Sequence, residues 1–193
     1  MRTTFAFRLP DWAAPHLGAA ATGPLEDRID GLCAAIRALW QQEAGTAEGD
    51  ALANDQLRER VYLMMYCLRA EGRIEAARSH MRRAGRRGRR PKSDAASVFV
   101  DALHHVFRDD EDGDPDAPAA ERAADAVSSK SRPRIARELA YALEHDVPPV
   151  LVLPFLRHRT QAEILRRQKL GLVEDWLCHP APLSPAPAPT EPG

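Results

Sequence analysis

Apolar residues recur at helical spacing along most of the chain. From residue 25 to residue 39 they follow one another at alternating intervals of four and three residues, Trp40 stands beside the last of them, and Gly45 ends the pattern. Because an α-helix turns once every ~3.6 residues, this spacing places them on one face. We therefore expect a first helix that packs into the core through Leu25, Ile29, Leu32, Ile36, Leu39 and Trp40.

Further stretches carry the same signature. A second helix is predicted to begin at Asn54 or Asp55, either of which can cap it, and to end at Gly72. A third follows up to Gly85, and we expect the second and third to pack antiparallel because so few residues join them. Their inward residues are predicted to be Leu57, Val61, Met64, Leu68, Ile74, Ala77 and Met81.

Three more helices are predicted in the second half of the chain, over residues 94–107, over residues 134–144 and from Thr160 onward. Thr160 and Glu163 have the spacing of a capping box, in which each side chain bonds a free backbone N–H at the helix start. Residues 119–126 are Ala-rich and could add a short helix. The expected core positions are Val98, Phe99, Ala102, Leu103, Val106, Ile135, Leu139, Ala142 and Leu143.

Two segments could instead be strands. Residues 3–9 alternate apolar and polar side chains, which is the period of a strand, although an extended arm would fit as well. Residues 147–154 are apolar and rich in proline, and periodicity alone does not separate a buried strand from a helical turn that starts at proline. We therefore predict a mainly α protein, a single helical domain of about five or six helices, with or without one small strand pair formed by residues 3–9 and 149–153.

Length and composition define the expected domain limits. A chain of 193 residues fits one domain with tails. We predict an N-terminal strand or arm and linker over residues 1–23, the helical domain over residues 24–178, and a disordered proline-rich tail over residues 179–193. No run reaches the ~18 apolar residues of a membrane span, and no secretory signal is evident, so we expect a soluble, cytoplasmic protein without a membrane partner. The widely spaced Cys33, Cys67 and Cys178 indicate reduced thiols.

The second and third predicted helices have a familiar spacing. Gly72, Ile74, Ala77, Met81 and Ala84 stand at offsets that resemble one tetratricopeptide repeat unit. No second copy occurs 34 residues away in either direction, and a solenoid needs about three stacked repeats. We therefore interpret the stretch as a helical hairpin of ordinary geometry.

Charge is distributed very unevenly. The formal net charge is −1, yet residues 51–93 hold 12 basic and 4 acidic side chains, and no acid occurs between Glu75 and Asp94. So dense a run of arginine favours a polyanionic partner. Within it, the run Gly88-Arg89-Arg90-Pro91-Lys92 is similar to the Gly-Arg-Pro core of the AT-hook motif, with one extra arginine between the glycine and the proline.

The opposite pole is an acidic stretch at residues 109–116, which has six acids in eight residues and is expected to be a solvated loop. It does not fit a helix-loop-helix calcium site. With Gly113 at the sixth position, the first and twelfth positions fall on Arg108 and Ala119, which cannot supply the required oxygen ligands.

Motifs for catalysis are absent from the sequence: there is no nucleophile elbow, phosphate loop, dinucleotide fingerprint or zinc-protease motif. His104 and His105 lie one helical turn before Asp109, so a metal site or an acid-base pair is conceivable there. Adjacent histidines point about 100° apart on a helix and cannot share one ion, so we favour an ordinary helix-face histidine. We expect no enzyme activity, no cofactor and no metal.

These observations predict a non-enzymatic nucleic-acid-binding protein, regulatory or part of a nucleoprotein assembly, that grips the phosphates of DNA or RNA through its arginine-rich segment. The alternative is a helical adapter that binds proteins through the hairpin of residues 55–84 and the proline-rich tail. The basic segment could also bind an acidic protein partner. A third possibility is that it is a solvated loop that binds nothing specific, or that it pairs with the acids of residues 109–116 in the same molecule. The candidate nucleic-acid-binding residues are Arg78, Arg82, Arg83, Arg86, Arg87, Arg89, Arg90 and Lys92.

Overall fold

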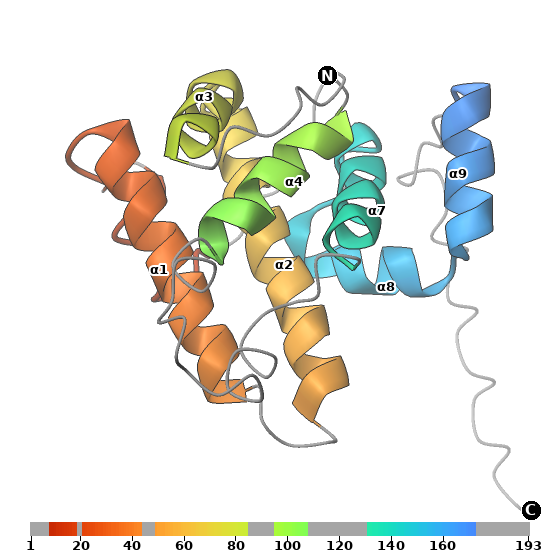
Figure 1. Cartoon of the computed structure of the whole chain (residues 1–193), viewed down its shortest axis with the longest axis horizontal. Helices are drawn as coiled ribbons and strands as arrows, with labels where there is room; N and C mark the ends of the chain where they lie inside the picture. Colours follow the sequence, from red (N-terminus) through yellow and green to blue (C-terminus); the bar gives the residue numbers. More distant parts are fainter. Residues whose placement is uncertain (1–7, 19–20, 44–48, 85–94, 108–130, 173–193) are drawn as a thin grey trace, which may run out of the picture.

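Helices account for all of the regular structure in the described part of the chain. The computed structural model describes residues 8–18, 21–43, 49–84, 95–107 and 131–172, and these contain seven α-helices, one 3-10 helix and no strand (Figure 1). The prediction of a mainly α, single helical domain is confirmed, with at least one helix more than expected. The elements are α1 (Leu25–Glu43), α2 (Gly49–Ala70), α3 (Ile74–Ala84), α4 (Ala95–Val106), α7 (Arg132–Glu144), η1 (Pro149–Leu151), α8 (Val152–Arg157) and α9 (Gln161–Leu170).

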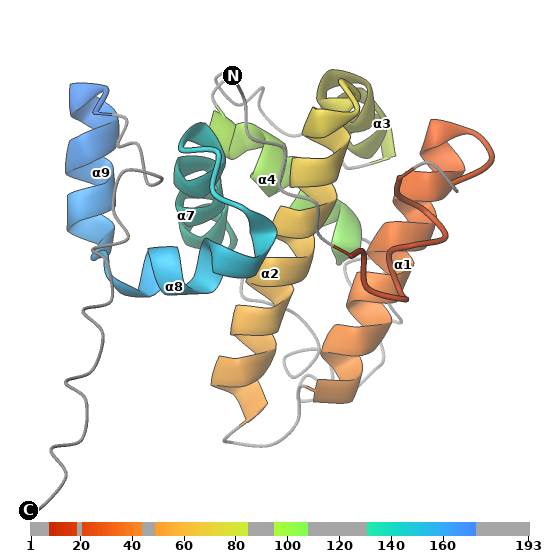
Figure 2. The ribbon, with the colours of Figure 1, turned by 180° about the vertical axis from the view of Figure 1, so that it is seen from behind.

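Helix α2 is the centre of the fold. Five consecutive residues, from Val61 to Met65, are buried, whereas a helix at the surface buries only one stripe. The reason is visible in Figures 1 and 2: α2 runs through the middle of the molecule and contacts α1, α3, α4, α7 and α8. The predicted inward residues Leu57, Met64 and Leu68 are fully buried, as expected.

The predicted apolar face of α4 is buried throughout, and that of α1 is buried except at Leu25 and Leu39, which are half-buried. Ile29, Leu32 and Ile36 are fully buried along α1, and Trp40 continues the same stripe. The Trp40 ring meets the ring of Phe107 edge to face, with the centroids 5.1 Å apart, so the far end of α1 is joined to the end of α4 by an aromatic contact.

The start of α2 differs from the prediction. The helix begins at Gly49, more than a turn before Asn54 and Asp55. Asp55 does not act as a cap; its carboxylate accepts hydrogen bonds from Arg58 and from Arg157 of α8. The Asp55 carboxylate, which the sequence suggested as a helix cap, is therefore bound to two arginine side chains, one on α2 itself and one on α8.

Residues 149–157 are helical, so the predicted strand pair does not form with residues 149–153. Pro149 opens η1 and Pro154 lies in the first turn of α8. Proline fits the first turn of a helix because the N–H that it lacks would have no partner there. Of the other proposed strand, only residues 8 and 9 lie within the described part of the chain.

The junction between α2 and α3 is tight but does not give an antiparallel hairpin. Gly72 adopts a positive φ of 70° in the turn, a conformation that glycine tolerates best. In Figures 1 and 2, α2 rises from the bottom to the top of the view while α3 is seen nearly end on, so the two helices cross steeply. Helix α3 packs on α1 and α4 as well as on α2, and these contacts set its direction.

The C-terminal helix α9 has the predicted ends. The Thr160 side chain accepts a hydrogen bond from the backbone N–H of Glu163, and Gly171 ends the helix in the left-handed conformation. In the part of the chain that the structure describes, no helix has both the length and the apolar character needed to span a membrane.

Candidate functional site

Helix α3 directs its side chains to three different places. Ala77 and Met81 are buried in the core, as the spacing predicts. Arg78 points to α4 and His80 to α1, while Arg82 and Arg83 in the last turn are exposed to solvent. The candidate site therefore has two parts on one short helix: its basic end, and the contact that His80 makes with its neighbours.

Arg78 belongs to the interface between α3 and α4. Its guanidinium donates a hydrogen bond to the Ser97 hydroxyl and pairs with Asp101 at 3.4 Å. The Arg78 and Asp101 side chains are 11% and 13% exposed. Burial raises the pKa of Asp101, and the hydrogen bond from Arg78 opposes that rise without cancelling it. The sequence grouped Arg78 with the exposed basic residues, whereas the structure commits its guanidinium to α4.

Arg82 and Arg83 lie at the exposed end of α3. The Nε of Arg83 donates to the carbonyl of Ser79 one turn earlier. Among the described residues, no carboxylate lies within ion-pair distance of either guanidinium. The other predicted contact residues, Arg86, Arg87, Arg89, Arg90 and Lys92, lie outside the described residues.

Many other described arginines have partners. Ion pairs join Arg28 to Glu71, Arg58 to Glu138, Arg60 to Glu43, Arg69 to Asp146 and Arg167 to Glu163. Arg157 pairs with Asp55, and Arg159 lies over the ring of Phe155. Helix α9, which carries Arg166 and Arg167, lies on the far side of α7 from α3 (Figures 1 and 2). The C-terminal arginines therefore do not extend the basic end of α3.

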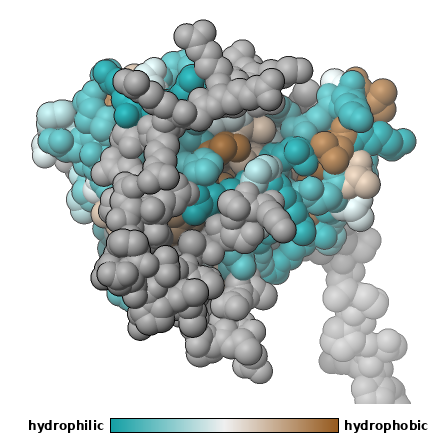
Figure 3. Space-filling model, viewed as in Figure 1, coloured by the Kyte–Doolittle hydropathy of each residue, from teal (hydrophilic) through white to brown (hydrophobic). Residues whose placement is uncertain are grey.

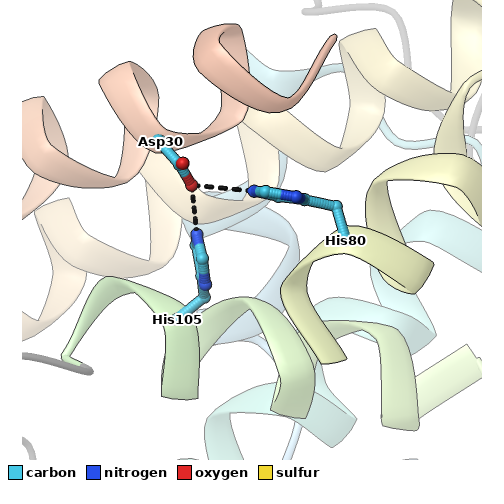
Figure 4. Close-up of side chains that lie close together, drawn as sticks. All are labelled: Asp30, His80 and His105. Atoms are coloured by element: carbon cyan, nitrogen blue, oxygen red, sulfur yellow. Dashed lines mark hydrogen bonds and ion pairs between the residues drawn. The ribbon is translucent and has the colours of Figure 1, made fainter. Parts of the chain in front are cut away.

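The second part of the site is a cluster of two histidines and one aspartate. Asp30 comes from α1, His80 from α3 and His105 from α4, and their side chains converge (Figure 4). The Nε2 atoms of His80 and His105 donate to the same oxygen, Oδ1 of Asp30, at 2.9 and 2.7 Å. The two imidazole rings meet at 70°, with centroids 5.4 Å apart. One side chain from each of three helices thus meets at a single oxygen atom.

Exposure varies strongly within the cluster. The side chain of His105 is 3% exposed, that of His80 17% and that of Asp30 50%. Partial burial raises the pKa of Asp30, but the hydrogen bonds from the two histidines and their positive charge outweigh it, so the pKa lies below its ordinary value. Asp30 is therefore an anion at neutral pH, and it closes the cluster on the side that faces solvent.

The sequence analysis considered His105 together with His104 and Asp109, whereas the structure shows partners that are distant in sequence. The structure pairs it with residues 75 and 25 positions earlier in the chain, and no local spacing connects those positions. Asp109 lies outside the described residues. His104, the adjacent histidine, accordingly points elsewhere and contacts Arg132. One sequence signal was available: Asp30 and His80 are polar residues that stand directly beside the core positions Ile29 and Met81 on their predicted helices.

Neither Cys33 nor Cys67 belongs to either region. Cys33 is buried and Cys67 partly buried, and neither forms a disulfide among the described residues. Burial together with the nearby Glu71 raises the pKa of Cys67 to about 12, so this thiol is a poor nucleophile and a poor metal ligand. Cys178 and the acids of residues 109–116 lie outside the described residues.

Comparison with protein-family models, with curated proteins and with solved structures finds no match to this chain.

Proposed function

We propose that the protein binds nucleic acid without catalysing a reaction, and that it contacts phosphates through the end of α3 and the basic residues that follow. Arg82 and Arg83 would make the first contacts, and Arg86, Arg87, Arg89, Arg90 and Lys92 would continue them along the backbone of the DNA or RNA. Arg78 is left out of this set because its guanidinium is already bound to Ser97 and Asp101.

One observation carries the proposal. Acidic side chains neutralise many of the described arginines, but Arg82 and Arg83 are exposed with no described carboxylate in reach. They stand at the head of a run in which five further basic residues and no acid occur before Asp94. Because the formal net charge of −1 includes this basic run, the rest of the chain is net acidic and would repel a polyanion, so binding would be confined to this end.

A structural role for Arg82 and Arg83 is the competing explanation. Basic side chains in the last turn of a helix interact favourably with its dipole, and each contributes about 0.3–1 kcal/mol. With that role alone, substitution would cause a small loss of stability and would not change how salt affects the binding of nucleic acid. Phosphate binding has the opposite signature, because each neutralised phosphate releases counterions.

The test is a salt titration of binding. Fluorescence anisotropy is measured with labelled duplex DNA and single-stranded RNA of mixed sequence, from about 50 to 200 mM salt. Replacing Arg82 and Arg83 with Gln should reduce the slope of log K against log salt by roughly two for duplex DNA, and replacing Arg86, Arg87, Arg89 and Arg90 should reduce it by roughly three to four. All sequences should weaken alike, since nothing identifies a helix that reads bases.

The matched control changes the same charge on another face. Arg166 and Lys169 are exposed on α9, so the double replacement of both with Gln removes two positive charges far from α3. It should leave the slope unchanged. Absence of binding by the parent protein at low salt would refute the proposal, and so would an equal loss in the α9 control, which would reflect overall charge alone.

A second candidate, the helical adapter, has one observation in its favour. A groove of about 280 Å³ lies between the N-terminal segment, α2 and η1, and is lined in part by Trp12, Leu63 and Val150. The side chain of Val150 is 63% exposed at this groove. Apolar side chains also gather over α9 (Figure 3), where Leu170 and Leu172 are exposed. Binding to such surfaces would be insensitive to salt, so the same titration separates the two candidates.

A further inference from the structure

The cluster of Asp30, His80 and His105 has the donor set of a metal site. Neutral imidazole nitrogen and carboxylate oxygen are both ligands of Zn²⁺ and of related divalent ions. The three donor atoms, one from each residue, all lie within 4.8 Å of one another. We propose that these three side chains bind one divalent transition-metal ion, with Zn²⁺ as the ion that suits the site best.

The distances require only a small adjustment. Ligands at about 2.0–2.2 Å from a tetrahedral zinc ion are roughly 3.3–3.5 Å from one another. The present separations from Asp30 Oδ1 are 2.9 and 2.7 Å, so the carboxylate must retreat by roughly half an ångström or somewhat more to admit the ion. The donor nitrogens of His80 and His105, which lie within 4.8 Å of each other, must come to the same ligand spacing by rotation of the rings. Asp30 can do so because its side chain is half exposed at the surface of α1.

The protein orients the histidines in the required way. Both present Nε2, and not Nδ1, to the common point (Figure 4). His105 is held by burial between α1 and α4, and the ring of His80 lies against it. To bind the ion, each ring carries its hydrogen on Nδ1 and offers the Nε2 lone pair, which is the commonest arrangement for histidine ligands.

Charge favours the ion as well. A carboxylate and two neutral imidazoles together supply one negative charge, which partly compensates a divalent cation. Arg78, which also lies where α3 meets α4, is paired with Asp101. Three protein ligands leave a tetrahedral ion one position for water on the solvent side, where Asp30 is exposed.

An ion at this point would join three helices that are distant in sequence. Asp30 and His80 are 50 residues apart, and Asp30 and His105 are 75 residues apart. Because the site exists only in the folded chain, the metal would stabilise the native state, and the gain would grow with the logarithm of the ratio of free metal concentration to Kd. The same helix α3 carries Arg82 and Arg83, but this inference does not depend on the proposed function.

The experiment uses the full chain after treatment with EDTA and removal of the chelator. Titration calorimetry with ZnCl₂ should give one equivalent bound with Kd below ~10 μM, and the thermal midpoint should rise with Zn²⁺. Titration with Co²⁺ supplies a second readout, because a bound Co²⁺ ion absorbs visible light and a Co²⁺–thiolate bond adds a near-ultraviolet band. We expect the visible bands without the thiolate band.

Variants locate the ion. Asp30→Asn and His80→Gln preserve size and hydrogen bonding and should each weaken Zn²⁺ binding at least ~100-fold and abolish the rise of the thermal midpoint. Asp27→Asn, one turn earlier on α1, and His158→Gln, after α8, are the matched controls and should bind as the parent does; both positions are exposed. If circular dichroism shows that His80→Gln does not fold, Asp30→Asn alone tests the location of the ion.

Two results would overturn the proposal. The first is the absence of stoichiometric binding of Zn²⁺ and Co²⁺ by the parent protein, which would leave a hydrogen-bonded cluster of structural importance only. The second is binding that survives Asp30→Asn in full, which would place the ion elsewhere in the chain.

Discussion

Replacement of Arg78 with Met tests whether this arginine holds α3 to α4 or contacts a ligand. Methionine keeps most of the apolar stem and removes the guanidinium. In the parent protein that group binds the Ser97 hydroxyl and the Asp101 carboxylate, and Ser97 is 2% exposed. The variant therefore leaves both acceptors without the donor that the fold provides.

The size of the effect follows from burial. Removing one partner of a fully buried ion pair costs about 3–5 kcal/mol, because the remaining charge is left in a poor solvent. The Arg78 and Asp101 side chains are 11% and 13% exposed, so water partly solvates the remaining charge and lowers the loss of stability. We expect Arg78→Met to lower the free energy of unfolding by about 2–4 kcal/mol at neutral pH.

The pH dependence has a definite sign. Burial already raises the pKa of Asp101, and loss of Arg78 should raise it further. A carboxyl whose pKa is higher in the folded state than in the unfolded state favours folding where it is protonated and loses that contribution as the pH rises through the folded pKa. The deficit of the variant should therefore shrink as the pH is lowered towards 4.

Urea unfolding followed by circular dichroism measures these values, with Arg82→Met as the control. Arg82 is exposed, so its replacement should change stability by no more than about 0.5 kcal/mol. The double variant Arg78→Met with Asp101→Asn should recover part of the loss, since the orphaned charge is gone. A loss below about 1 kcal/mol for Arg78→Met, or an equal loss for both single variants, would refute the structural role.

Two further predictions concern α1 and α2. A Cβ at Gly31 would overlap the imidazole of His16, so Gly31→Ala should destabilise the parent protein. In a His16→Ala background the same change should stabilise the protein by about 0.5–1 kcal/mol, because alanine favours a helix more than glycine does. Urea unfolding of the four proteins of this double-mutant cycle measures both effects, and additive changes in the free energy of unfolding would show that the ring moves aside freely. The pKa of Cys67, raised to about 12, keeps its thiol protonated at pH 8. Iodoacetamide should therefore alkylate it at least roughly 100 times more slowly in the native protein than in urea, as followed by peptide mass mapping. Equal rates would contradict the burial of this thiol.

The sequence by itself determined the helices and their inward faces. The spacing of Leu32 and Ile36 on α1, or of Phe99 and Leu103 on α4, predicts burial that the structure confirms. The capping signal at Thr160 was equally informative. These features depend on residues within one or two turns of each other, and helix geometry relates such residues without reference to the rest of the chain.

Tertiary structure alone decided the rest. The apolar pattern of residues 149–157 is compatible with a strand or with a helix, so it does not decide between them. The structure shows that they form η1 and α8, which pack against α2 and α7. Arg78 and Arg82 are one turn apart in the same basic run, yet one is bound to α4 and the other is exposed. Asp30, His80 and His105 share no local pattern; the crossing of α1, α3 and α4 brings them within hydrogen-bonding distance. Periodicity fixes which face of a helix is apolar, but the contacts between polar residues depend on how whole helices are placed, and many distant packing interactions set that placement together.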